Sequence, residues 1–127
     1  MSGMKRAGRL LLETFRVTAV LPKVELMRCR LGTGRAIDRS RERGRHSPLR
    51  TPEARTDLQR VIRMLDRLMP SGPNCFRRVL LEVALDRAAA AERVMLGLNS
   101  GLVRRSGHAW LEAAGPTPER YDTQLSV

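Results

Sequence analysis

The run PSGP at positions 70–73 constrains the fold more than any other stretch, because it separates two helical patterns. Proline lacks a backbone N–H and glycine accepts turn conformations, so a helix that reaches this run must end there. Before it, apolar residues recur at helical spacing and predict a helix over 53–69, with Thr51 as N-cap and Pro52 in its first turn. After it, a second helical pattern begins at Cys75.

Cys75 is predicted to stand at the N-terminus of this second helix, which the pattern extends to about Glu92. The first N–H groups of a helix have no partner within the helix, and the helix dipole is positive at that end. Both effects favour a thiolate, which is the nucleophilic form of cysteine. Cys75 is therefore the candidate nucleophile. Arg77 and Arg78 oppose the dipole in the first turn, so we expect them on the surface or in contact with a partner.

An imidazole follows in the segment His108 to Glu112, which has strand character. Because side chains alternate between the two faces of a strand, His108, Trp110 and Glu112 should share one face. A strand-borne histidine that faces a helix-borne cysteine is the arrangement of an activated thiol nucleophile. A third group must orient the imidazole, and Asp122 lies far enough past the intervening Gly-Pro turn to return beside it.

Several alternatives stay open from the residues alone. Glu112 or Glu119 could replace Asp122, with Glu112 the first choice because it shares the face of His108. The same arrangement of Cys, His and Asp also serves acyl transfer to amines, so the class of acceptor is not determined. The third alternative is a non-catalytic basic module for nucleic acid or a partner protein, in which the cysteine and the histidine never meet.

The fold class that these patterns predict is α+β. Strands are expected at 94–98 and 108–112, with a turn at 99–101 between them and a last strand near 121–127. Together they would form a small antiparallel sheet against the central helix that begins at Cys75. We expect residues 51–127 to hold this catalytic core.

Residues 1–50 are expected to form a basic helical segment and a connector. Apolar spacing predicts a helix over 9–21 that ends at Pro22, then a second helix over 23–31 in which Cys29 is a small buried hydrophobe. The stretch 35–50 is rich in arginine and poor in apolar residues, so it predicts a mobile connector.

The positive charge is concentrated in this N-terminal part. Residues 1–50 hold 13 of the 24 Lys and Arg residues but only 4 of the 13 Asp and Glu residues. Nucleic acid is not the expected partner, because no aromatic residues alternate with the basic ones to stack on bases. A solvated basic face agrees with the pattern, and a surface that docks an acidic peptide or protein stays open as an alternative.

The remaining composition places the chain among small globular proteins without a cofactor. Its 127 residues, 42% hydrophobic, allow one modest core. Two cysteines are too few for a disulfide framework, and neither has partners at metal-site spacing, so we expect a cytoplasmic protein without a metal. No segment is apolar enough to span a bilayer or to serve as a signal peptide, so no membrane association is expected.

The candidate site also resembles a known family. The order Cys75-Phe76-Arg77-Arg78, an aliphatic helix, Leu96-Gly97-Leu98 and then GHAWLE at 107–112 resembles the protease of lasso-peptide maturation. That protease is a transglutaminase-like, papain-like cysteine peptidase, which removes the leader from a ribosomally made precursor peptide. The resemblance covers the C-terminal half of the chain, and the N-terminal part only in its Leu-rich and Arg-rich character.

The resemblance implies the same site residues as the chemistry does. Cys75 falls on the nucleophile, His108 on the base and Asp122 on the third residue. It also implies a precursor peptide as substrate, a separate leader-binding protein as partner and a lasso cyclase that acts next. Two positions depart from the family pattern: Val79 stands where serine is frequent, and residues 88–91 lack the glycine that usually breaks the helix.

Overall fold

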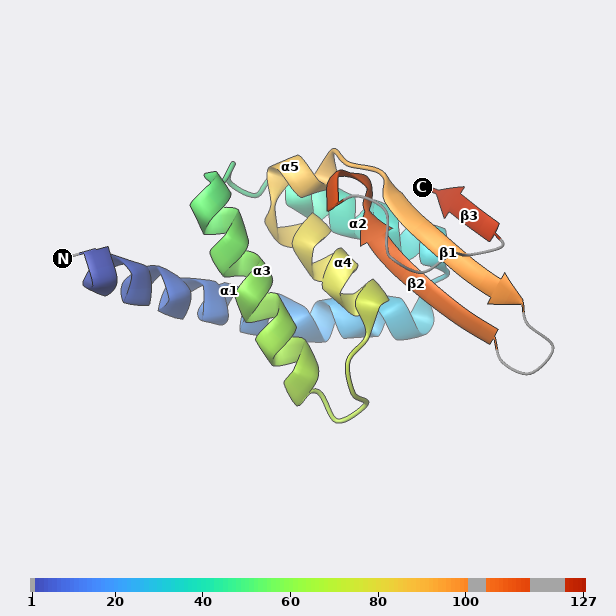
Figure 1. Ribbon diagram of the computed structural model, residues 1–127, viewed down its shortest axis with the longest axis horizontal. Helices are drawn as coiled ribbons and strands as arrows, with labels where there is room; N and C mark the ends of the chain where they lie inside the picture. Colours follow the sequence, from blue (N-terminus) through green and yellow to red (C-terminus); the bar gives the residue numbers. More distant parts are fainter. Residues whose placement is uncertain (1, 101–104, 115–122) are drawn as a thin grey trace.

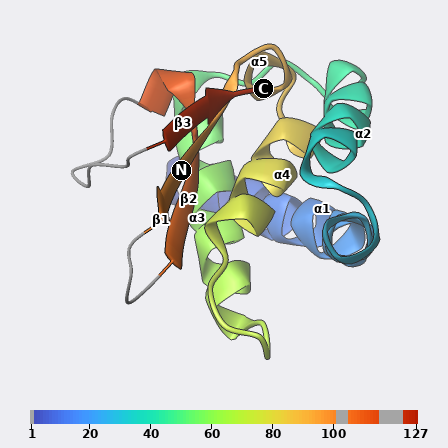
Figure 2. The ribbon, with the colours of Figure 1, turned by 90° about the vertical axis from the view of Figure 1, so that its right-hand side faces the viewer.

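The computed structural model describes residues 2–100, 105–114 and 123–127. Its elements, in chain order, are α1 (Ser2–Arg30), α2 (Thr33–Arg45), α3 (Pro52–Leu68), α4 (Cys75–Leu85), α5 (Arg87–Ala90), β1 (Val94–Ser100), β2 (Arg105–Leu111), a 3-10 helix (Glu112–Ala114) and β3 (Thr123–Ser126). The helices form one layer and the strands form a second layer beside it, as Figures 1 and 2 show. The predicted α+β class is confirmed.

The sheet has three strands in the order β2-β1-β3, and both pairings are antiparallel. In the pairing of β1 with β2, Gly97 lies opposite His108 and Met95 lies opposite Trp110. Strand β2 also contacts α4, so this strand is placed between the rest of the sheet and the helical layer (Figure 1). The small antiparallel sheet expected beside the Cys75 helix is therefore present.

Helix α4 lies at the centre of one hydrophobic cluster. Its residues Leu80, Leu81 and Val83 are completely buried. The cluster also takes in Val17, Val20 and Val24 from α1, Ala36 and Ile37 from α2, Leu58, Val61 and Ile62 from α3, and Val94, Ala109 and Leu111 from the sheet. Because burying an aliphatic side chain contributes about 1.5–3 kcal/mol, α1 and α2 are part of what stabilises this fold.

Helix α1 corrects the prediction that a helix ends at Pro22. It is continuous from Ser2 to Arg30 and contains the proline in its interior. Proline removes one backbone hydrogen bond there. However, Val17, Val20 and Val24 form a buried stripe on both sides of Pro22, and this packing holds the two halves in one helix. Cys29, expected to be buried, is exposed on this helix.

Helix α2 corrects the prediction of a mobile connector at 35–50. Ala36, Ile37, Ser40 and Gly44 recur at helical spacing and are buried on the side that contacts α4. A Cβ built at Gly44 would lie 1.9 Å from the carbonyl oxygen of Val83, so glycine permits this close approach of the helices. The buried stripe is narrow, and Ile37 is its one large apolar residue beside Ala36, Ser40 and Gly44, so the many arginines dominate the sequence pattern of this segment.

The two helices of the C-terminal half begin where the sequence predicts. Thr51 caps α3 by accepting a hydrogen bond from the N–H of Ala54, and the predicted helix over 53–69 is confirmed to within two residues. Helix α4 begins at Cys75 but ends at Leu85, earlier than expected. Asp86 interrupts it in an extended conformation, and its side chain caps the short α5 by accepting from the N–H of Ala88.

Candidate active site

Cys75 is the first residue of α4, as its position after the PSGP run predicts. Asn74 is the N-cap, and its side-chain oxygen accepts a hydrogen bond from the N–H of Arg77 at 2.9 Å. The Cys75 side chain is partly exposed and its thiol is free. The N-terminal N–H groups of α4 thus lie beside a sulfur that solvent or a substrate can reach.

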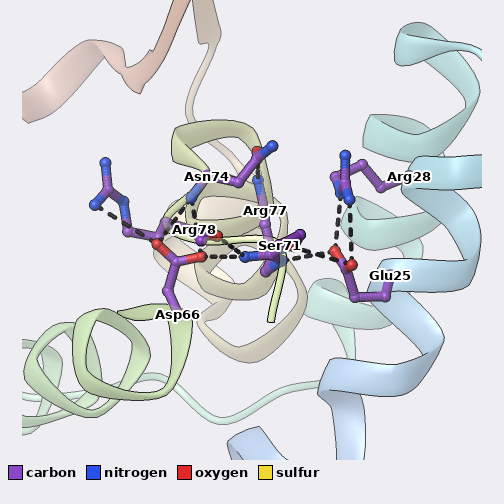
Figure 3. Close-up of polar contacts among 8 residues, drawn as sticks. Glu25, Arg28, Asp66, Ser71, Asn74, Arg77 and Arg78 are labelled. Carbon is purple, nitrogen blue, oxygen red and sulfur yellow. Dashed lines mark hydrogen bonds and ion pairs between the residues drawn. The ribbon is translucent and has the colours of Figure 1, made fainter. Parts of the chain in front are cut away.

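Arg77 corrects the expectation of a surface arginine, because it is completely buried. Its guanidinium donates to Asp66 at 2.7 Å and to Glu25 at 2.6 Å. It also donates to the hydroxyl of Ser71 at 2.7 Å and to the carbonyl of Gly72 at 3.0 Å. Figure 3 shows the two carboxylates on either side of the guanidinium, one from α3 and one from α1. A buried arginine with this many acceptors is a structural anchor.

The same network holds the residue before the nucleophile. Both carboxylate oxygens of Asp66 accept from the N–H of Asn74, at 3.1 and 3.2 Å. Arg78, which is 35% exposed, lies 3.7 Å from Asp66 and lines the cavity described below. Asp66, completely buried, thereby connects the end of α3 to the start of α4 and fixes where Cys75 lies.

The charges in this network are strongly stabilised. Hydrogen bonds from Arg28 and then from Arg77 lower the pKa of Glu25 from 4.5 to about 2. The pKa of Arg77 is raised, chiefly by its hydrogen bond to Glu25. The carboxylate of Glu25 is therefore ionised throughout the neutral and mildly acid range.

His108 lies in the middle of β2, and its ring stacks on Trp110. The ring centroids are 5.6 Å apart and the planes differ by 22°. This confirms that the two side chains share a face of the strand, while Ala109 and Leu111 on the other face join the hydrophobic core. Trp110 is 9% exposed, so it forms a rigid wall beside the imidazole.

One cavity of about 550 Å³ contains both Cys75 and His108 in its lining. Its α4 wall is a single helical face, formed by Cys75, Arg78, Val79 and Glu82. Residues 108–111 all line it, from both faces of β2, so the cavity extends along the edge of that strand. Helix α3 supplies most of the remaining wall. The predicted thiol and imidazole therefore line the same cavity.

The cavity also contains a half-buried cluster of polar and charged side chains that sequence reasoning missed. Glu82 accepts a hydrogen bond from Gln59 at 2.8 Å, and Arg55 lies 3.7 Å from Glu92. Desolvation raises the pKa of both Glu82 and Glu92. Glu82 was detectable in principle, since it follows Cys75 by two helical turns on the same face. Glu92 and Arg55 come from distant elements, and no sequence pattern joins them.

The third residue of the predicted triad is not placed. Asp122 and its substitute Glu119 both lie outside the described residues. Glu112, the other substitute, is exposed and opens the 3-10 helix after β2; its backbone N–H donates to the carbonyl of Arg93 at 3.0 Å. Within the described ranges, no group of three His, Cys, Asp or Glu side chains is arranged to hold a metal ion.

No protein-family model, no curated protein and no solved structure matches this chain. Of the helices in the described part, none is long and apolar enough to cross a membrane. The chemistry of the cavity and the sequence motifs around Cys75 and His108 are therefore the features that bear on function.

Proposed function

We propose that this chain is a cysteine peptidase that removes the leader from a ribosomally made precursor peptide, as in lasso-peptide biosynthesis. The observation that carries the proposal is that Cys75, at the N-terminus of α4, and His108, on β2, line the same cavity. A thiol at a helix N-terminus beside an imidazole is the arrangement required for nucleophilic catalysis. The resemblance of the Cys75 and GHAWLE motifs to the lasso-peptide leader protease suggests the substrate.

In the proposed reaction, the Cys75 sulfur attacks the scissile carbonyl carbon after His108 has taken the thiol proton. The carbon–nitrogen bond then breaks, and His108 gives the proton to the leaving amine, which leaves an acyl-enzyme thioester. Water, activated by the neutral imidazole, adds to the thioester. The carbon–sulfur bond breaks, and the products are a carboxylic acid and the free thiol.

In our proposal, two further groups assist these steps, one by binding the oxyanion and one by orienting the imidazole. The N–H of Cys75, in the first turn of α4, is a donor to the oxyanion that forms during attack. Asp122 accepts from the imidazole of His108 and holds it in the reactive orientation. The core of this arrangement, a nucleophile helix packed on an antiparallel sheet, would be the transglutaminase-like fold that the motifs imply.

The same resemblance suggests the partners. The proposal includes a separate leader-binding protein that presents the precursor, and a cyclase that consumes the product. Both thiols are free, which agrees with action in a reducing cytoplasm.

The experiment is a cleavage assay of the full chain with a candidate precursor, with and without the leader-binding protein, followed by mass spectrometry. Wild type should release leader and core peptides whose masses add up to the mass of the precursor plus one water. Cys75→Ala and His108→Ala should release neither, whereas the matched control Cys29→Ala should behave as wild type. Products that carry an added amine would assign the site to acyl transfer instead. Full cleavage by Cys75→Ala would exclude the proposed nucleophile.

A further inference from the structure

Helix α1 presents apolar side chains to solvent on the face opposite its buried one. Met4, Leu11 and Phe15 are 77%, 72% and 74% exposed. Their spacings of seven and four residues place them along one line of the helix, the spacing of a coiled-coil seam. We call this line the apolar stripe. In Figure 1 the N-terminal turns of α1 extend beyond α3.

The apolar stripe ends at a groove. This groove has a volume of about 460 Å³ and begins at Phe15. Ala19 and Val20 from α1, Pro48 from the α2–α3 connection and Leu85 from the end of α4 give it an apolar lining, and Arg16, Arg43 and His46 line it as well. A concave apolar pocket next to an exposed phenylalanine is suited to receive a partner's side chain.

The charge at the groove end of the stripe is positive. Arg16, Arg43 and Arg50 line the groove, and no acidic residue is among the described residues that line it. Helix α1 itself carries seven Lys and Arg residues and two acids, and its Arg6 and Arg9 pair with Asp57 of α3. Glu13 is 2% exposed and is paired with Arg50, and Glu25 is paired with Arg28 and Arg77, so neither acid contributes free negative charge to this surface. A second copy of this chain, with a formal charge of +11, would be repelled. The complementary partner is acidic.

We infer that the apolar stripe and its groove bind an acidic amphipathic helix of a partner protein. The heptad spacing accommodates the apolar seam of such a helix, and the arginines that line the groove attract its acidic side chains. Anionic lipid also suits a basic and apolar helix, but a bilayer surface does not fill a concave groove. This surface is lined by different residues from the Cys75 cavity, so the inference is independent of peptidase activity.

The test measures binding of the full chain to a fluorescent synthetic helix of about three heptads, with Leu at the seam positions and Glu at the flanking ones. A peptide of the same composition in scrambled order is the probe control. Leu11→Ser/Phe15→Ser should weaken binding about tenfold or more, as loss of apolar anchors does. The control Leu68→Ser, which removes an exposed leucine from α3, should leave binding of the helix unchanged.

A second pair of variants tests the groove, and each variant adds one negative charge. Ala19 and Thr18 are neighbouring exposed residues, but only Ala19 lines the groove. Ala19→Glu should reduce binding of the helix about tenfold, whereas Thr18→Glu should reduce it far less. Circular dichroism should show the same helix content in all variants, because each changed side chain is exposed.

Three results would overturn the inference. The first is equal affinity for the ordered and scrambled peptides, which would leave only nonspecific attraction between charges. The second is Phe15-dependent binding to phosphatidylglycerol vesicles with none to the peptide, which would assign the surface to membranes. The third is binding to duplex DNA that exceeds binding to the peptide and is unchanged in Leu11→Ser/Phe15→Ser.

Discussion

Replacing Arg77 with methionine should destabilise the fold and disorder the start of α4. The change leaves the completely buried Asp66 without its principal counterion, and it removes one of the two arginines that pair with Glu25. Removing one partner of a buried ion pair costs about 3–5 kcal/mol. Asp66 keeps the N–H of Asn74 and the more distant Arg78, so we expect the low end of that range, about 3 kcal/mol.

The assay is urea unfolding at neutral pH, followed by circular dichroism, with Arg60→Met as the matched control. Arg60 is exposed on α3, so its loss should change stability by less than about 0.5 kcal/mol. Alkylation of Cys75 should also slow in Arg77→Met under conditions where the protein stays folded, because the network fixes the residue before the nucleophile. Arg77→Lys should recover only part of the stability, since an ammonium cannot reach the same set of acceptors.

A loss of less than about 1 kcal/mol in Arg77→Met, similar to that in Arg60→Met, would refute this reasoning. The buried network would then not stabilise the junction of α3 and α4. If Arg77→Met loses the expected stability but Cys75 is alkylated at the wild-type rate, the network supports the fold without positioning the thiol.

Three further predictions concern other parts of the molecule. Because the pKa of Glu25 is lowered to about 2, its ionised carboxylate stabilises the fold fully above pH 4.5, and this stabilisation is lost as the pH falls from 4.5 towards 2. In urea unfolding across this window, the free energy of unfolding should fall further in wild type than in Glu25→Gln, by up to about 3 kcal/mol. Equal decreases in the two proteins would show that Glu25 does not contribute to the loss of stability in acid. Gly44→Ala should lower the free energy of unfolding by about 1–3 kcal/mol in the same assay, because the new methyl group would meet the carbonyl oxygen of Val83. An unchanged free energy of unfolding would disprove the close contact. Asp122→Asn should lower the cleavage rate by a large factor, on the order of 10⁴ if the analogous serine triad is a guide, and full activity would move the orienting role to Glu112 or Glu119.

The sequence predicted those features that depend on local signals. The capped start of α3, the start of α4 at Cys75 and the shared face of His108 and Trp110 follow from breakers, caps and strand alternation. Each of these is decided within a few residues of the chain, so a pattern of residue types is sufficient to find it.

The features that sequence reasoning missed depend on contacts between distant segments. Pro22 stays helical because of a buried valine stripe on both sides of it, and α2 packs through small residues among arginines. Arg77 is buried because Glu25 and Asp66, remote in the chain, converge on it. Such tertiary contacts override local propensity, and only the folded arrangement shows them.

The alkylation rates of the two cysteines in one molecule test the central claim most directly. Cys29 is exposed and Cys75 only partly so, and accessibility alone would therefore make Cys29 react faster with iodoacetamide. If His108 and the α4 N-terminus activate the thiol, Cys75 should react faster at neutral pH, and His108→Ala should remove most of that advantage without affecting Cys29. Preferential labelling of Cys29 in the folded wild type, or a Cys75 rate that His108→Ala leaves unchanged, would contradict the proposed catalytic pair.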